Sequence, residues 1–426
     1  MMIPPPSNIV VVGGGYIGVQ FAQELAKHLT PSQASITLIE KNDFTFHCVG
    51  VPRALVDPSF VKKLFIPLDH ALPSTATVLR GIVDKIDGKV VVVRPIVDDK
   101  AQSTPTRVPF DYLVLATGSS YVSPIKVPLQ EYTRASVEAA ITATAERIKA
   151  ASSVLVVGGG PVGVEIAAEV AAAYPSKCIT ILERHDRLMH NAGVKDAFRE
   201  QLTAKLAKLN VHVVLGERLV HDSGPPASAV ATTDRGTSID ADMQLLCAGM
   251  LPNVDLIRRL DPTLLSIRSR GIRVNGACQI DDRRYSHVFV VGDASDHPTP
   301  KLAYVGAFQA KHVAAQLAKV VVSSTTSSSS SRKEVVLEPY VPPTSEGLLV
   351  PLGPTLGVGQ VPVLGGIVVG DAVVRFIKGN DYFASTFLDQ WHTTEDGAAI
   401  PPKKRSGGWA VLVVAVAVAA WYFSKS

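Results

Sequence analysis

The chain has 426 residues, of which 46% are hydrophobic, and its formal net charge is +4. A chain of this length and composition can bury large cores in two or three domains. The charge is spread along the sequence without a basic stripe interleaved with aromatic residues, which argues against nucleic-acid binding. The four cysteines form no C-x-x-C pair, which argues against dithiol–disulfide exchange chemistry.

The first predicted element is a buried strand, a sharp turn and a helix, in the stretch IVVVGGGYIGVQFA. Its glycines form the G-x-G-x-x-G pattern with one glycine inside it: Gly13, Gly14, Gly15 and Gly18. Such glycines allow a tight turn, a close approach of a pyrophosphate, and close packing of the helix on the strand. The next predicted strand ends at Glu40, where dinucleotide-binding α/β folds place a carboxylate that binds a ribose hydroxyl.

A second copy of the same unit follows in the stretch VLVVGGGPVGVEIAAE. Gly158, Gly160 and Gly163 repeat the glycine pattern, and Glu183 ends the following predicted strand, CITILE. A single pattern of this kind also occurs in ordinary turns, and two unrelated strand–turn–helix units are the alternative interpretation. Two copies that are complete with strand, helix and carboxylate predict two bound dinucleotides.

Three further predicted strands end in glycine-containing turns. The stretch DYLVLATGSS contains Ala116, Thr117 and Gly118, the stretch ADMQLLCAGMLPN contains Gly249, and HVFVVGDASD contains Gly292 and Asp293. With the two glycine motifs, and in this order, they resemble the two-dinucleotide-binding flavoproteins. The resemblance implies that the first motif binds FAD and the second NAD(P)H, with Asp293 on the flavin ribityl chain. The alternative for Asp293 is a structural turn residue at a strand end.

Later segments narrow the resemblance. FVKKLFIP, TPKLAYVGAFQAKHVA, VPLGPTLGVGQVP and VGDAVVRFIKGNDYFAS are similar to the apoptosis-inducing-factor branch, and within it to the ferroptosis suppressor proteins. The chain departs from that branch in its Ser-rich insert and its apolar C-terminal tail. It also lacks a glycine after the initiator methionine, so N-myristoylation is not implied.

The resemblance also implies roles for residues outside the glycine motifs. Glu165 would face the nicotinamide and flavin, and Lys378 would lie beside the flavin, where an ammonium stabilises the anionic reduced form. Phe383 would line the quinone pocket, while Arg53 and Lys63 would contact FAD. The alternatives are a partly exposed helix charge paired with a neighbour for Glu165, a solvated loop residue for Lys378, a core position for Phe383 and a solvated surface charge for Lys63.

The predicted fold class is α/β, with two Rossmann-like domains, a small α+β C-terminal domain and a C-terminal transmembrane helix. The expected divisions are an FAD-binding domain over 7–120 and 285–322, an inserted NAD(P)H-binding domain over 121–284, a Ser-rich loop over 323–333, a C-terminal domain over 334–393, a linker over 394–408 and a membrane tail over 409–423.

The tail has the features of a membrane anchor. Residues 407–423 carry no charge and would extend about 25 Å as a helix, the short end of what crosses a bilayer. Trp409 and Trp421 lie near its ends, and Lys403 and Lys404 precede it, which predicts a cytosolic catalytic region. The mitochondrial outer membrane is the expected location, with endoplasmic reticulum or lipid droplet as alternatives. A terminal strand or helix docked on the protein is the other interpretation.

Together these features predict an FAD-dependent NADH:quinone oxidoreductase acting on a lipid quinone, with NADPH the weaker donor. A reductase of a soluble acceptor is one alternative. A second is an NADH-binding, pro-death signalling flavoprotein with little turnover, in which the nucleotide drives dimerisation or a conformational change. No histidine or cysteine spacing indicates a metal site, so no metal is expected.

Overall fold

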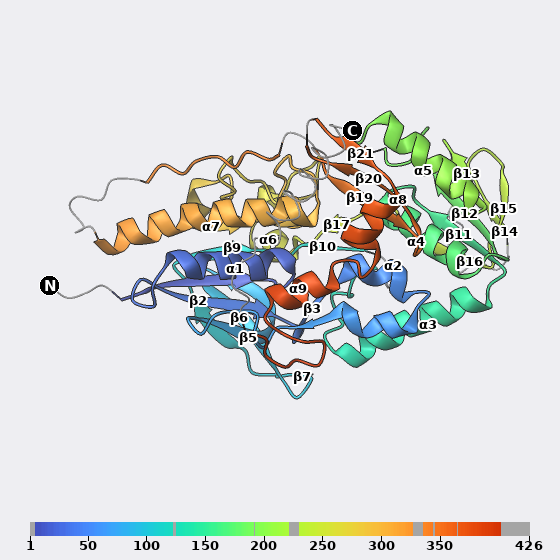
Figure 1. The fold of residues 1–426 in the computed structure, drawn as a ribbon. Helices are drawn as coiled ribbons and strands as arrows, with labels where there is room; N and C mark the ends of the chain where they lie inside the picture. Colours follow the sequence, from blue (N-terminus) through green and yellow to red (C-terminus); the bar gives the residue numbers. More distant parts are fainter. Residues whose placement is uncertain are drawn as a thin grey trace.

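The computed structural model describes residues 5–121, 125–190, 192–220, 230–326, 335–343, 346–363 and 365–401. Figure 1 shows two α/β units side by side, with the red C-terminal elements packed where they meet. The first unit combines the blue N-terminal elements with the orange helix α7, and the second unit, in green, is inserted between these two stretches of chain. The arrangement confirms two dinucleotide-binding folds, one inserted in the other.

The first unit is built on an eight-stranded sheet of order β18-β9-β1-β2-β5-β6-β7, with β8 paired to β6. The strands from β18 to β5 are parallel, and β6 to β8 form an antiparallel extension. The strands are β1 (Ser7–Val12), β2 (Ala34–Glu40), β5 (Ala76–Asp87), β6 (Val90–Val97), β7 (Lys100–Ala101), β8 (Thr106–Pro109), β9 (Tyr112–Leu115) and β18 (Val288–Val290).

Strand β1 is apolar on both faces because both faces of the sheet are covered. On one face Ile9 and Val11 share a core with Leu25 of helix α1 (Tyr16–His28) and Leu317 of helix α7 (Ala303–Thr326). On the opposite face Val10 and its neighbours form a second core. Burial on both sides is typical of parallel sheets and explains the continuous valine run.

The second core shows that the boundary expected at residue 285, between the inserted domain and the second part of the first unit, lies earlier in the chain. It includes Val254, Ile257, Ile272 and Ile280, which lie in the range expected for the inserted domain. The chain leaves the inserted unit at the short pair β10 (Ser119–Ser120) and β17 (Leu251–Pro252) and then packs on the first sheet. The first unit therefore resumes near residue 254 and not at 285, because the apolar residues that follow β17 cover this face.

The inserted unit has a four-stranded parallel sheet of order β13-β12-β11-β16. Its elements are α3 (Arg134–Ala150), β11 (Ser153–Val157), α4 (Pro161–Ala173), β12 (Cys178–Glu183), α5 (Asp196–Lys208), β13 (Val211–Leu215), the hairpin β14 (Val230–Thr232) and β15 (Ser238–Asp240), and β16 (Met243–Leu246). Helix α4 is buried over nearly its whole length, including two glutamates, Glu165 and Glu169.

The C-terminal unit packs on α4. Its antiparallel strands β19 (Leu348–Leu352), β20 (Leu356–Val361) and β21 (Ile367–Val369) precede helix α8 (Asp371–Val374), a π-helix (Arg375–Gly379) and helix α9 (Ala384–Gln390). Leu348 and Val350 share a core with Val164 and Ala168 of α4. The chain after β21 is helical.

Short elements complete the fold. They are β3 (Phe44–Phe46), the 3-10 turn Cys48–Gly50, α2 (Val51–Ala54), the 3-10 helix Pro58–Leu64, β4 (Phe65–Pro67), α6 (Asp255–Leu260) and the 3-10 turns Pro262–Leu264, Arg283–Tyr285 and Gly292–Ala294. The segment from Cys48 to Leu64 lies against α4 and joins the two α/β units in one core.

Two predicted segments differ from expectation, and one lies outside the described residues. Helix α7 continues to Thr326, through the start of the expected Ser-rich loop, because Val321 is still buried and the Ser324 hydroxyl bonds its carbonyl at 2.7 Å. The start of the expected linker is a turn on the first unit, where Glu395 lies 3.0 Å from Lys62. The membrane tail lies outside the described residues, and none of the described helices has the length and apolarity of a membrane span.

Candidate functional site

The first glycine turn leaves room for a bound group at the start of helix α1. A side chain at Gly13 would clash with the Ala116 carbonyl at 2.4 Å, and one at Gly18 with the Gly13 carbonyl at 1.8 Å. By contrast, a Cβ at Gly15 would meet no atom within 4 Å. No side chain caps the helix, so its first N–H groups are available to an anion.

The second turn repeats this geometry at helix α4. A Cβ at Gly163 would lie 2.0 Å from the Gly158 carbonyl, so the helix needs glycine there to pack on the strand. A Cβ at Gly160 would meet nothing within 4 Å, and no side chain caps α4. Both turns therefore have the donors and the open space that a pyrophosphate requires.

A carboxylate stands behind each turn. Glu40 accepts hydrogen bonds from the backbone N–H of Gly14 (2.6 Å), and Glu183 accepts them from Gly159 (2.7 Å) and His185 (2.9 Å). Burial alone would raise the pKa of Glu183, but these hydrogen bonds together lower it below its ordinary value. Glu183 is thus held ionised at the position expected for a ribose partner.

One cavity of about 1160 Å³ connects the two turns. Fifteen of the residues predicted from the sequence lie in its wall: Gly13, Gly14, Gly15, Glu40, Ala116, Thr117, Gly118, Gly158, Gly160, Glu165, Glu183, Gly249, Gly292, Asp293 and Lys378. They come from both α/β units and from the C-terminal unit. The residues present therefore fit two dinucleotides that meet in one space.

The remaining predicted residues lie behind or beside this wall. Gly18 and Gly163 pack each helix on its strand, as the glycine pattern predicts. Lys63 is half-buried with its ammonium 5.3 Å from the Phe60 ring centroid, and Phe383 is half-buried against the core of the first unit. Their contacts with FAD and quinone stay predictions.

Lys378 and Glu165 form a buried ion pair inside the cavity. Their side chains are 11% and 5% exposed, and the Lys378 ammonium donates to Glu165 Oε1 at 2.5 Å and to the Leu349 carbonyl at 3.1 Å. Burial raises the pKa of Glu165 to about 7, although the neighbouring ammonium acts to lower it. The pair brings a cation and a carboxyl group that titrates near neutrality to the junction of the two turns.

Arg53 lies outside the cavity wall and joins the three units instead. Its guanidinium makes two hydrogen bonds to Glu169 (2.8 and 2.9 Å) and one to the Gly379 carbonyl (3.3 Å). The Tyr382 hydroxyl donates to the same carboxylate at 2.6 Å. This buried contact fixes the π-helix that carries Lys378. Glu169 was missed in the sequence, although it lies one helical turn after Glu165, on the same face.

Two polar groups around Asp293 were also missed. The Ser119 hydroxyl donates to Asp293 Oδ2 at 2.6 Å, and the Lys126 ammonium lies 3.3 Å from the same oxygen. Both residues line the cavity. No motif marks either residue, because the fold alone brings residues 119, 126 and 293 together. Within the described ranges there is no cluster of three or more His, Cys, Asp or Glu side chains that could hold a metal ion.

Comparisons with known proteins agree with this site. The pattern of the family described as pyridine nucleotide-disulphide oxidoreductase matches residues 7–310. The chain is 29% identical over 411 residues to apoptosis-inducing factor homolog B of Dictyostelium discoideum, covering 91% of this chain and 98% of that protein. It is also 29% identical over 391 residues to ferroptosis suppressor protein 1 of Homo sapiens, covering 91% and 95%.

Among solved structures, the sulfide:quinone oxidoreductase of Aquifex aeolicus has the same fold, with a TM-score of 0.67 over 90% of each chain and 16% identity. FAD and NAD(P)H are the cofactors typical of this family, and the two turns fit them. The chain belongs to the pyridine nucleotide-disulphide oxidoreductase family, is similar over nine-tenths of its length to apoptosis-inducing-factor-like proteins, and is an NAD(P)H-dependent flavoprotein oxidoreductase.

Proposed function

We propose that this chain oxidises NADH through FAD and passes the electrons to a lipid quinone at a membrane surface. The observation that carries the proposal is the Lys378–Glu165 pair, which lies in the one cavity that both glycine turns share. The family's cofactors account for the hydride chemistry. The pair adds a charge and a proton-binding group at the place where electrons would be transferred.

The residues of the cavity have separate tasks in this reaction. The glycine turns bind the two pyrophosphates, and bound FAD supplies the chemistry that accepts a hydride and releases electrons. The Lys378 ammonium favours negative charge in its neighbourhood. The overall reaction, NADH + H⁺ + quinone → NAD⁺ + hydroquinone, takes up one proton, and Glu165, whose burial raises its pKa to about 7, is placed to hold it.

The quinone part of the proposal rests on the apolar tail and on the fold. A tail anchored in a bilayer would hold the cavity close to acceptors dissolved in lipid, and a soluble acceptor would need no such tail. The fold is shared with a sulfide:quinone oxidoreductase. Ubiquinone-like molecules are therefore the proposed acceptors.

Turnover distinguishes this proposal from the signalling alternative. The purified full-length chain, in detergent, should oxidise NADH at steady state when a short-chain quinone is present. A stable long-wavelength charge-transfer band with negligible turnover would instead support an NADH-binding sensor. Rapid turnover with a soluble protein acceptor, and none with quinone, would favour the soluble reductase.

The donor preference is expected to be modest. A 2′-phosphate would bring about two negative charges towards Glu183, and each unit-charge pair at 4 Å costs on the order of 4 kcal/mol at a dielectric constant of 20. Arg184 and His185 line the same part of the cavity and offset much of this cost. We expect kcat/KM to favour NADH over NADPH by about tenfold, or about 1.4 kcal/mol. Equal values for the two donors would show that the basic residues cancel the charge of Glu183.

The tail is expected to determine where the protein resides but not its chemistry. Deleting residues 403–426 should release the protein into the soluble fraction, because the apolar run over residues 409–423 is then gone. Activity with a water-soluble quinone should remain close to that of the full chain. If the shortened protein still sediments with membranes in high salt, another segment anchors it.

A further inference from the structure

The loop between β12 and α5, described at residues 184–190 and 192–195, forms one side of the cavity. We call it the adenosine loop, because it directly follows Glu183, the carboxylate expected to bind the adenosine ribose of NADH. His185, Met189, His190 and Ala192 of this loop line the cavity. The rings of His185 and His190 stack with centroids 3.7 Å apart. The loop therefore supplies much of the surface that the adenosine half of the donor would meet.

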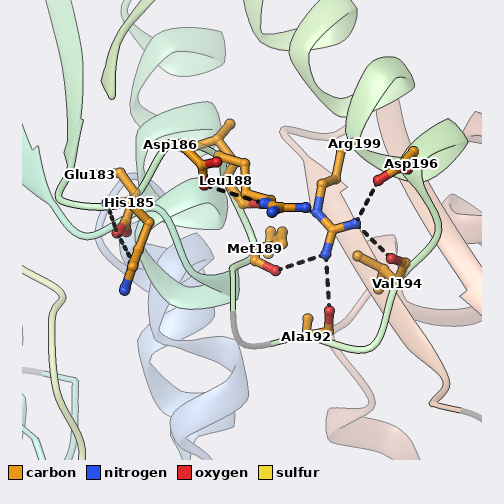
Figure 2. Close-up of polar contacts among 10 residues, drawn as sticks. Glu183, His185, Asp186, Leu188, Met189, Ala192, Val194, Asp196 and Arg199 are labelled. Atoms are coloured by element: carbon orange, nitrogen blue, oxygen red, sulfur yellow. Dashed lines mark hydrogen bonds and ion pairs between the residues drawn. The ribbon is translucent and has the colours of Figure 1, made fainter. Parts of the chain in front are cut away.

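The guanidinium of Arg199, from helix α5, holds this loop from the side away from Glu183, as Figure 2 shows. It donates to the carbonyls of Val194 (2.7 Å), Ala192 (3.1 Å), Leu188 (3.3 Å) and Met189 (3.3 Å). A further contact of 3.2 Å reaches Asp196. The Arg199 side chain is only 16% exposed, so these charge-assisted hydrogen bonds are partly shielded from water. A single side chain thus binds four backbone carbonyls of the adenosine loop.

Arg199 is linked through the loop to the second glycine turn. Met189 adopts a left-handed conformation (φ 54°), which is unusual for a residue with a side chain and has to be held by its surroundings. Its carbonyl accepts from Arg199, and its N–H donates to the Gly159 carbonyl at 2.8 Å. The Gly159 N–H in turn donates to Glu183. Three hydrogen bonds therefore connect Arg199 with the ribose-binding carboxylate.

The first glycine turn has a matching support built from other residues. There the Gly14 carbonyl accepts from the Thr45 hydroxyl at 2.6 Å, which itself accepts from the Trp391 indole at 2.9 Å. In both turns the carbonyl of the middle glycine is thus fixed by a chain of hydrogen bonds from a buried or half-buried side chain. Because both turns support the carbonyl of their middle glycine in this way, we expect Arg199 to shape the nucleotide site and not only to hydrogen-bond the carbonyls of its loop.

We infer that Arg199 is a positioning residue for the adenosine half of NADH, through the adenosine loop, and that it has no part in hydride transfer itself. The inference rests on the proposed use of NADH. It predicts that removing the Arg199 guanidinium raises KM for a donor that carries the adenosine half but not for a donor that lacks it. A residue that only stabilises the fold would affect every donor alike, together with the FAD content.

The test compares NADH with reduced nicotinamide mononucleotide, which carries the same hydride but lacks the adenosine half. In Arg199→Met, which keeps the length of the side chain and removes its donors, KM for NADH should rise by about tenfold, the ratio that corresponds to one charge-assisted hydrogen bond. The value of kcat with NADH, kcat/KM with the truncated donor and the FAD content should stay unchanged. Arg199→Lys should fall between Arg199→Met and the unchanged protein, because a lysine cannot reach four carbonyls at once.

The control variant is Arg107→Met, which removes an exposed guanidinium from strand β8. Arg107 pairs with Asp87 and does not line the cavity. Its kinetics should equal those of the unchanged protein. An unaltered KM for NADH in Arg199→Met and Arg199→Lys would overturn the inference, as would equal losses with both donors. If the unchanged protein itself failed to oxidise NADH, the proposed function would fail, which is a separate result.

Discussion

Replacing Lys378 by methionine is expected to lower kcat for NADH-dependent quinone reduction by about a hundredfold, while FAD stays bound. The ammonium lies in the cavity that both turns share and is almost fully buried, so no solvent cation can replace it. Removing one preorganised charge or donor from a dry site typically costs about 10²–10³ in rate. The measurement is steady-state turnover with a short-chain quinone, together with the flavin content of each preparation.

Glu165→Gln tests the other half of the pair and its proton. Because burial raises the pKa of Glu165 to about 7, the carboxyl is neutral below this pH and ionised above it. If its proton enters the reaction, kcat falls as the pH rises through about 7, and Glu165→Gln loses that inflection. Lys319→Met, in an exposed pair with Glu338, is the matched control and should change neither kcat nor its pH dependence. Normal turnover in both Lys378→Met and Glu165→Gln would remove the pair from the chemistry.

Adding one methyl group in front of each helix should assign each turn to its cofactor. Gly15→Ala is expected to weaken FAD binding, and Gly160→Ala to weaken NADH binding with FAD retained. Both positions have φ near −75° in extended backbone, which alanine tolerates, and neither Cβ would lie within 4 Å of an atom of the described residues. The methyl would instead occupy the space of the pyrophosphate, at a cost of about 1–3 kcal/mol, about five- to 150-fold in affinity.

The two variants control for each other, because each should leave the other nucleotide bound as before. Gly18→Ala is a further comparison, since its Cβ would lie 1.8 Å from the Gly13 carbonyl and should disturb the fold of the first unit itself. Titration of FAD into stripped protein and of NADH into the FAD-loaded protein measures both affinities. An exchange of the two effects would show that the assignment of the turns is reversed.

The sequence predicted the glycine turns and their carboxylates well because that signal is local. Strand, turn, helix and following strand are consecutive, so Gly13 to Glu40 and Gly158 to Glu183 could be placed without knowing the rest of the fold. The same holds for Asp293, which directly follows a predicted strand. Within each of the two sheets these residues follow strands that end at the same edge, and the structure brings both edges to one cavity.

Arg53 and Ser119 show where the sequence was insufficient. The Glu169 carboxylate that binds Arg53 comes from a helix 116 positions later, and Asp293 lies 174 positions from Ser119. No periodicity or spacing predicts such partners. The boundary near residue 254 was missed for the same reason, since Val254 and Ile257 are as apolar as any core residue and only the sheet they cover decides their domain.

We propose that one cavity brings FAD and NADH together and that the electrons leave to a quinone. The most direct measurement is the absorbance spectrum of the purified full-length chain under anaerobic conditions. We predict about one non-covalent FAD per chain. Adding NADH should bleach the absorbance of the oxidised flavin, and adding a ubiquinone analogue should restore it. A protein that stays colourless after incubation with FAD, or a flavin that NADH does not bleach, would show that the cavity does not join these two cofactors.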